Sequence, residues 1–407
     1  MIIHNCEGVS VIVENRTIYM DNSATTPVRK EVVEEMLPYL TENFGNPSSI
    51  YDPGKVSKRA IEEARKKVAD AIGAEENEIY FTSGGTESDN WALKGIAFAN
   101  RNKGKHIITS SIEHHAVLHA CSWLEGQGFE VTYLPVDKYG MVAPEDLRNA
   151  IRDDTILISI MLANNEVGTI QPVEEIGKIA KEKRIYFHTD AVQAIGHVPI
   201  DVQKMNIDLL SLSGHKFGGP KGCGGALYIR KSVKIEALFH GGGAQERKRR
   251  AGTENVPAIV GLGKAIELAT CELEEENKTL LEMRERLIEG LLQVPKTHLN
   301  GHPTERLANN VNITFEFIEG GESLLLLLNA KGIFASTGSA CNSTSLEPSH
   351  VLTACGVPHE IVHGSLRLSL GKMNTQENVD RVLEVLPEIV QKLRNMSPLT
   401  PQEYRKF

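Results

Sequence analysis

The sequence predicts an α/β protein: a mostly parallel, seven-stranded-type sheet with helices on both faces, plus a smaller α+β domain. Two patterns support this. Apolar strands and helical segments alternate between about residues 78 and 212, and these strands are continuous apolar runs, as in parallel sheets buried on both faces. A third pattern concerns the site. Polar residues gather just after the C-terminal ends of five strands, where such sheets bind their ligands.

The composition indicates an ordinary soluble protein and excludes several classes. The 407 residues, 41% hydrophobic and 24% charged, allow two domains with separate cores. The net charge of −9 argues against nucleic acid or an anionic membrane as main partner. Six scattered cysteines without a CxxC pattern disfavour a disulfide framework or a zinc knuckle. With no signal peptide pattern and no apolar run long enough to span a bilayer, a cytoplasmic protein is expected.

The elements of the larger domain are predicted in chain order. A strand at 9–13 and a short strand at 19–20 precede helices over 28–42 and 55–72. The predicted strands that follow are 78–82, 106–109, 131–134, 155–162, 185–187 and 207–212. Three helices are predicted between them: one begins at about 89, the next ends at about 124, and the third covers 173–182. The polar residues that follow five of these strands are Thr86; His114; Asn165; Asp190 and Gln193; and Ser213, His215 and Lys216.

The sequence changes character near residue 270, which predicts a second domain. A charged connecting helix over 271–292 leads to a half-buried strand at 312–317 and a helix over 322–331 whose five leucines are expected in the core. A strand at 365–370 and a helix over 375–395 follow; Pro387 should kink or split this helix, and the tail from 397 should be mobile. The predicted division is a large domain, 28–272, and a small domain, 1–27 with 273–407, carrying a mobile cysteine loop at 336–349.

Lys216 is the first candidate for chemistry. It follows a buried strand and is flanked by glycines rather than carboxylates. Desolvation lowers an amine's pKa and makes it nucleophilic, which suits a Schiff base. A surface loop lysine beside a turn is the competing interpretation, and this stretch alone does not decide between them.

The turn at Gly84, Gly85 and Thr86 is a candidate phosphate cradle, because a helix N-terminus offers free N–H groups and a positive dipole. Neither the P-loop spacing nor a GxGxxG after a strand is present, so a single phosphate is favoured over ATP or NAD. Asp190 could be a metal ligand, a base or the partner of a pyridinium nitrogen. A phosphate cradle, such an acid and a Schiff-base lysine together describe a pyridoxal phosphate (PLP) site.

Three histidines and one arginine have open roles at this stage. His114 could stack on the cofactor ring or move protons, or it could simply cap a helix. His115 and His119 lie four apart without an HExxH pattern, so they are interpreted as ordinary helix residues. Arg367, inside an apolar strand, needs an anionic partner: a substrate carboxylate or a structural salt bridge.

Seven segments together resemble one known family. They are 21–27 (DNSATTP), 45–49 (GNPSS), 82–88 (TSGGTES), 188–193 (HTDAVQ), 213–216 (SGHK), 250–255 (RAGTEN) and 336–341 (STGSAC). They resemble the group I cysteine desulfurases of the NifS/IscS type, in the class V branch of the fold-type-I PLP-dependent enzymes. The resemblance runs from about 18 to 398, nearly the whole chain.

The resemblance implies a role for each matching residue. Lys216 would bind PLP covalently and later take the substrate's α-proton, while Asp190 would pair with the pyridinium nitrogen and Gln193 with the ring hydroxyl. His114 would stack on the ring and help proton transfer. The phosphate would be bound by Gly85, Thr86, Ser213 and His215, and by Thr253 of a neighbouring subunit. The substrate carboxylate would be held by Asn165, which also contacts the cofactor, and by Arg367.

Cys341 gains its role from the same resemblance. Its thiolate would take the sulfur of L-cysteine as a persulfide and leave L-alanine, for iron–sulfur cluster assembly or other sulfur delivery, and it could transiently ligate an iron–sulfur cluster. The implied protein is a homodimer with shared active sites, in which the basic run 247–250 belongs to a dimer loop. It would serve an iron–sulfur scaffold or another acceptor; the tail after Pro398 does not match the family's scaffold-docking segment, which leaves the acceptor open. Alternatives are a selenocysteine lyase or other class V PLP enzyme, an idle sulfur-transfer scaffold, and a regulatory PLP-binding protein.

Overall fold

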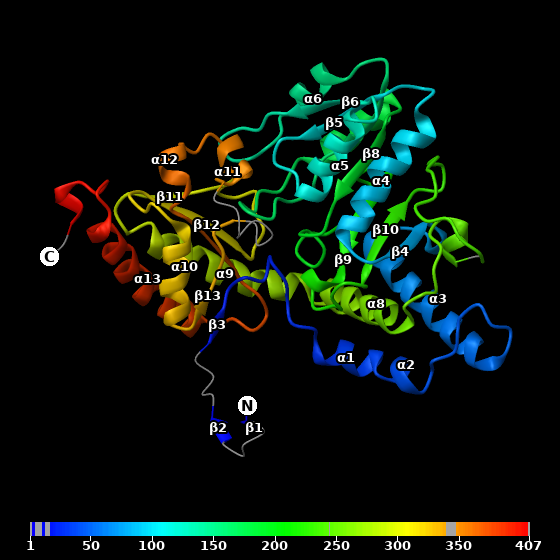
Figure 1. The fold of residues 1–407 in the computed structure, drawn as a ribbon, viewed down its shortest axis with the longest axis horizontal. Coiled ribbons are helices and arrows are strands. Elements are labelled where there is room, and N and C mark those ends of the chain that lie inside the picture. The colour runs from blue at the N-terminus through cyan, green and yellow to red at the C-terminus, as the bar shows by residue number, and fades with distance from the viewer. Residues whose placement is uncertain (1, 5–9, 13–16, 244, 339–346, 406–407) are drawn as a thin grey trace.

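A seven-stranded sheet forms the centre of the larger part of the protein (Figure 1). The computed structural model describes residues 2–4, 10–12, 17–243, 245–338 and 347–405. The strand order is β4 (Ile79–Thr82), β10 (Gly225–Ile229), β9 (Leu209–Ser213), β8 (Tyr186–Asp190), β7 (Thr155–Ser159), β5 (His106–Ser110) and β6 (Glu130–Leu134). Only β10 runs antiparallel to its neighbours in this sheet. The predicted α/β class with a mostly parallel sheet is confirmed, although the sequence analysis did not predict β10.

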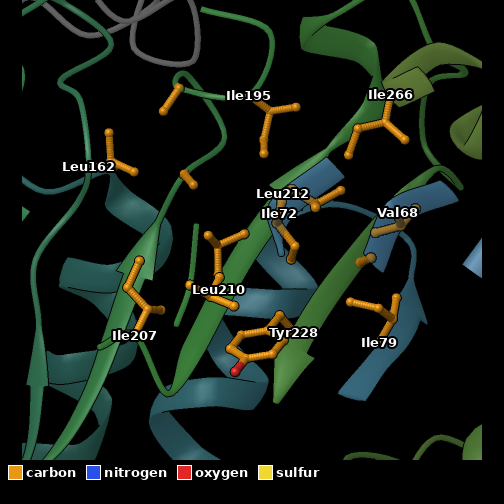
Figure 2. Close-up of a cluster of buried hydrophobic side chains, with 14 of the residues drawn as sticks. Val68, Ile72, Ile79, Leu162, Ile195, Ile207, Leu210, Leu212, Tyr228 and Ile266 are labelled. Atoms are coloured by element: carbon orange, nitrogen blue, oxygen red, sulfur yellow. The ribbon is translucent and has the colours of Figure 1, made fainter. Parts of the chain in front are cut away.

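Helices cover both faces of this sheet. One face packs against α4 (Gly85–Asn100) and α5 (His115–Glu125), through a cluster that includes Trp91 and Leu124. The other face packs against α3 (Asp52–Ile72), α6 (Pro144–Ala150), α7 (Val173–Lys183) and α8 (Val256–Cys271). Figure 2 shows part of that second core, where Ile72, Leu212 and Ile266 meet. Apolar side chains on both faces explain why the strands read as continuous apolar runs.

The smaller part has a separate core around an antiparallel sheet. Its strands are β11 (Thr297–Leu299), β12 (Asn310–Phe315) and β14 (Ser365–Ser369), and its long helices are α9 (Leu273–Leu291), α10 (Gly321–Ala330) and α13 (Gln376–Met396). The N-terminal β3 (Ile18–Tyr19) joins it by pairing with β13 (Ile333–Phe334), and the short helices α11 (His350–Ala354) and α12 (His359–Val362) lie beside it. A separate hairpin is formed by β1 (Ile2–His4) and β2 (Ser10–Ile12). The domain boundary at 272/273 stays a prediction.

Several helix predictions need correction. The helix expected over 28–42 is two helices, α1 (Lys30–Met36) and α2 (Pro38–Thr41), with Pro38 in the first turn of the second. This fits proline's place at helix starts. The helix expected from about 89 begins at Gly85, and α8 was not predicted separately. α13 runs as one helix through Pro387, so the expected split is wrong.

One burial prediction in the small part is wrong. Of the five leucines of α10, Leu324 and Leu328 are buried, whereas Leu326 is 68% exposed. The tail beyond α13, which was expected to be mobile, makes defined contacts: Thr400 is buried, and the Arg405 guanidinium donates to the carbonyl oxygens of Thr400 and Ser397. Within the described part of the chain, no helix is both long and apolar enough to cross a bilayer.

Candidate active site

The residues that follow the sheet strands line one cavity of about 170 Å³. The predicted site residues among its lining are Gly85, Thr86, His114, Asn165, Asp190, Gln193, Ser213, His215, Lys216 and Arg367. Thr253 does not line it and is exposed, while Cys341 falls within 339–346, outside the described residues. The geometric expectation that strand ends meet at one crevice therefore holds.

Lys216 lies at the end of the short 3₁₀ turn Gly214–Lys216 that follows β9. Its Nζ donates to the carbonyl oxygens of Ser23 (2.6 Å) and Ala24 (2.9 Å). These two carbonyl oxygens orient the amine. The side chain lines the cavity and is only partly exposed, which excludes the interpretation as a surface loop lysine.

The cradle is the first turn of α4. Gly85 and Thr86 are its first two residues, so their N–H groups lack partners within the helix. A Cβ on Gly85 would lie 2.7 Å from Val192 Cγ2, and one on Gly225 would lie 2.4 Å from Gly84 Cα. Glycine is therefore required for strand, turn and helix to approach this closely. A helix N-terminus opening onto a cavity is suited to a phosphate.

His215 completes this side of the cavity. Its Nδ1 lies 3.1 Å from the Thr25 hydroxyl. Burial, reinforced by the charges of Lys216 and Lys221, lowers the pKa of His215 to about 4. The ring is thus neutral at physiological pH and can only act by hydrogen bonding.

Asp190, the last residue of β8, is 6% exposed. Its Oδ1 accepts the N–H of Val192 at 2.8 Å. Burial raises the pKa of Asp190 to about 6, opposed by that hydrogen bond and by the positive charge of Lys216. A buried carboxylate with a raised pKa is stabilised by a cation, so Asp190 is suited to a cationic partner in the cavity.

Two further buried carboxyls lie near Asp190 and were missed in the sequence analysis. Asp89 lines the cavity, and Glu113 accepts hydrogen bonds from the Ser110 hydroxyl and the Met161 N–H. Burial raises the pKa of Glu113 to about 8. The signal for Asp89 was its spacing: it lies four residues after Gly85, so it shares the helix face that opens on the cradle.

His114 both caps α5 and lines the cavity. Its Nδ1 accepts the N–H of Ala116 at 3.1 Å, which leaves the ring proton on Nε2. Burial, followed by the charge of Lys216, lowers the pKa of His114 to about 4. The capping interpretation is therefore correct, while the role of His114 toward a cofactor stays a prediction. His115 lies outside the lining, with its ring 5.1 Å from His119 and 4.7 Å from His350.

Arg367 lies in β14 and reaches the cavity from the small part of the protein. Its Nη1 donates to the carbonyl oxygen of Asn165 and its Nη2 to Asp21 Oδ1, both at 2.9 Å. The structural salt bridge considered from the sequence is therefore present. Its Nε is buried without a hydrogen-bond partner among the described residues, so the guanidinium retains donor capacity.

The comparisons with known proteins decide the family. The profile described as Aminotransferase class-V matches residues 18–382. The chain belongs to the aminotransferase class-V family. It is 84% identical over 405 residues to "Cysteine desulfurase IscS" of Methanosarcina thermophila, with 100% of both chains covered. It is 62% identical to "Cysteine desulfurase IscS" of Clostridium botulinum strain Hall, covering 96% of this chain and 98% of the relative.

Solved structures of similar proteins share the fold of this chain. A "NIFS-LIKE PROTEIN" superposes with a TM-score of 0.86 at 43% identity, covering 92% of this chain and 99% of the other. A structure titled "SspA in complex with cysteine" superposes with a TM-score of 0.78 at 41% identity, covering 87% and 99%. The predicted class-V, fold-type-I resemblance is confirmed.

The cavity fits PLP, the cofactor of this class-V branch. Buried polar atoms on its walls lack partners among the described residues: Ser23 Oγ, Asp89 Oδ1 and Arg367 Nε. Orphaned buried groups are costly and indicate a polar ligand. The cradle at Gly85 can take its phosphate and Asp190 its ring nitrogen, with Lys216 supplying the amine.

The described ends of the cysteine loop are fastened to neighbours of two site residues. Ser349 Oγ donates to Glu166 Oε2 at 2.5 Å, and His350 Nε2 lies 3.0 Å from the carbonyl oxygen of Glu113. Glu166 follows Asn165, and Glu113 precedes His114. On the other side, the backbone of Ser336 pairs with that of Arg367. The loop that carries Cys341 therefore starts and ends beside the cavity.

Proposed function

We propose that this chain is a cysteine desulfurase, which converts L-cysteine to L-alanine and transfers the sulfur to Cys341 as a persulfide. The observation that carries the proposal is the convergence of the motif residues, Lys216 and Asp190 among them, on one cavity. The names of the relatives that cover the whole chain support the same activity.

Bound PLP supplies an electron sink for the bonds broken at the substrate's α-carbon. Lys216 would hold the cofactor through its amine, and its Nζ would take the α-proton of the bound substrate. Gln193, whose Nε2 donates to the carbonyl oxygen of Ser23, lines the cavity and would bond the ring hydroxyl. Asn165 and Arg367 orient the substrate carboxylate, because a planar guanidinium matches a carboxylate in two hydrogen bonds.

His114 moves the proton of the substrate thiol. Its neutral ring carries the proton on Nε2 and is engaged at Nδ1 by the Ala116 N–H. A neutral imidazole that is held in place by a hydrogen bond at one ring nitrogen is suited to transfer a proton at the other.

Cys341 completes the sulfur transfer. Its thiolate attacks the substrate sulfur; the new S–S bond forms as the carbon–sulfur bond breaks, and the electron pair stays with the carbon, which a proton then completes to alanine. The persulfide is passed to an acceptor thiol. The acceptor we propose is an iron–sulfur scaffold or another sulfur-acceptor protein, with Cys341 as a transient cluster ligand.

The functional unit we propose is a cytoplasmic homodimer with shared active sites. Thr253 is exposed and outside the cavity of its own chain. A role at the phosphate of a partner subunit accounts for both facts. The four cysteines among the described residues are free, which suits a reducing compartment such as the cytoplasm.

The test is to reconstitute the purified protein with PLP, add L-cysteine, quantify alanine and map persulfides by mass spectrometry. We expect alanine and a persulfide on Cys341. Cys341→Ser should keep bound PLP yet lose alanine formation, whereas Cys271→Ser, at an exposed cysteine, should behave like wild type. Unchanged alanine formation in Cys341→Ser would favour another class-V reaction.

A further inference from the structure

Asp89 is a buried carboxyl with no role in the mechanism above. It lies on α4, one helical turn after Gly85, and lines the proposed cofactor cavity. The residue is 1% exposed, and its Oδ1 has no hydrogen-bond partner among the described residues. Burying a carboxyl oxygen without a hydrogen bond destabilises the folded protein, so we looked for a function of Asp89 at the cofactor site.

The groups around Asp89 come from three elements. His188, on β8, lies with its Nε2 3.7 Å from Asp89 Oδ1. The ring of His188 is held between two hydroxyls: Ser159 Oγ at 2.8 Å from Nδ1 and Ser211 Oγ at 3.0 Å from Nε2. Ser211 also lies beside Asp89. Two hydroxyls satisfy a neutral imidazole, and burial lowers the pKa of His188 to about 3, so this histidine supplies no positive charge.

The remaining charges favour one ionised carboxyl rather than two. Asp190 is two residues along β8 from His188, so both side chains lie on the same face of the strand. Glu113 adds a third acid, and the cation that acts on Asp190 is Lys216. Two neighbouring buried carboxyls cannot both ionise cheaply. Asp190 has the Val192 N–H and Lys216 to stabilise its charge; burial and Asp190 together raise the pKa of Asp89 well above its usual value.

We propose that Asp89 is a positioning residue of the cofactor site: it remains protonated beside His188 on the cavity wall, and thereby leaves Asp190 as the ionised partner of the cofactor's ring nitrogen. This rests on the proposed binding of PLP at Asp190. The role explains why an acid is buried here although its charge is not used. A neutral carboxyl can donate a hydrogen bond, which an ionised one cannot.

The first test compares PLP affinity in wild type, Asp89→Asn and Asp89→Leu by absorbance titration of the apoproteins. Asparagine reproduces a neutral group that both donates and accepts, so its Kd should stay within about 3-fold of wild type, about 0.65 kcal/mol by RT ln 3. Leucine can neither donate nor accept a hydrogen bond at this wall of the cavity, so its Kd should rise about 10-fold or more. Equal weakening in both variants would mean that wild-type Asp89 acts as an anion and would overturn the proposal, as would a wild-type Kd in Asp89→Leu.

The second test uses the apoprotein alone and so reads the protonation of Asp89 without the cofactor. When folding raises the pKa of an acid, the folded state keeps a proton that the unfolded state releases once the pH exceeds the pKa of the unfolded state. The free energy of unfolding therefore falls as the pH rises above that pKa. Urea unfolding from pH 5 to 8 should therefore show Asp89→Asn gaining stability over wild type as pH increases. Parallel curves would refute a protonated Asp89. Failure of wild type to bind PLP would instead count against the proposed function.

Discussion

The two possible roles of Arg367 can be separated by a pair of substitutions. Arg367→Lys keeps the positive charge but removes the planar fork, so it cannot donate in parallel to Asn165 and to a carboxylate. Hydrogen bonds to charged groups contribute about 1.5–3 kcal/mol each. If the substrate carboxylate uses two of them, losing their combined contribution of at least about 3 kcal/mol lowers kcat/KM for L-cysteine about 100-fold.

The matched variant is Asp21→Asn, which removes the ion pair seen at 2.9 Å but leaves the guanidinium in place. A substrate-binding Arg367 is then released from a competing anion, so the KM for L-cysteine should fall or stay unchanged. Alanine formation over a range of cysteine concentrations measures both variants, and PLP absorbance confirms that each remains loaded. The reasoning fails if Arg367→Lys keeps a wild-type KM, or if Asp21→Asn raises the KM as much as Arg367→Lys does.

Three further outcomes are expected. Gly168→Ala should destabilise the protein by about 2 kcal/mol or more in urea unfolding, because its φ is +78° and a Cβ would lie 2.7 Å from Asn310 Oδ1; Gly222→Ala, at φ +74° with open space, should cost only about 1 kcal/mol. Lys216→Arg should bind PLP without a bond that borohydride fixes, as read by intact mass, and should form no alanine. Acid should weaken the apoprotein as pH falls from about 6.5 towards 4, because the unfolded state protonates histidines such as His188 that are buried neutral; urea midpoints that do not change over this range would contradict the burial argument.

Ligands of open α/β sheets bind at the carboxyl ends of the parallel strands, and this rule predicted the location of the site because the rule depends only on topology. His114, Asn165 and Lys216 are far apart in sequence, yet each follows a parallel strand of one sheet. The hydrophobic pattern identifies those strands, and right-handed parallel connections bring their carboxyl ends to one edge. No knowledge of side-chain contacts was needed.

The residues that were missed required contacts that a linear pattern does not contain. Asp89 reads as an ordinary polar position of a helix; its importance comes from burial against Asp190 and His188. Likewise, five consecutive leucines fix a hydrophobic segment but not which of them faces the core. In a helix, adjacent residues point about 100° apart, which is why Leu326 is exposed while Leu324 and Leu328 are buried.

Strand β10 was not predicted for a similar reason. Residues 225–229 follow a glycine-rich turn and precede a long irregular stretch, so no flanking helix marks them as part of the alternating pattern. The roles of Thr253 and Cys341 came from resemblance alone, because no periodicity in the sequence marks either residue.

The placement of β10 has a consequence for how the protein is made. β4 is an edge strand whose sheet neighbour is β10, and the glycine turn that follows β4 packs directly on Gly225. During synthesis the turn at Gly84 therefore lacks its β10 neighbour until residue 229 has left the ribosome, long after the residues of the turn have emerged. Pairings this distant in sequence form slowly, since the chain between them must be ordered first. The cofactor cradle is consequently complete only after the last strand of the sheet has paired.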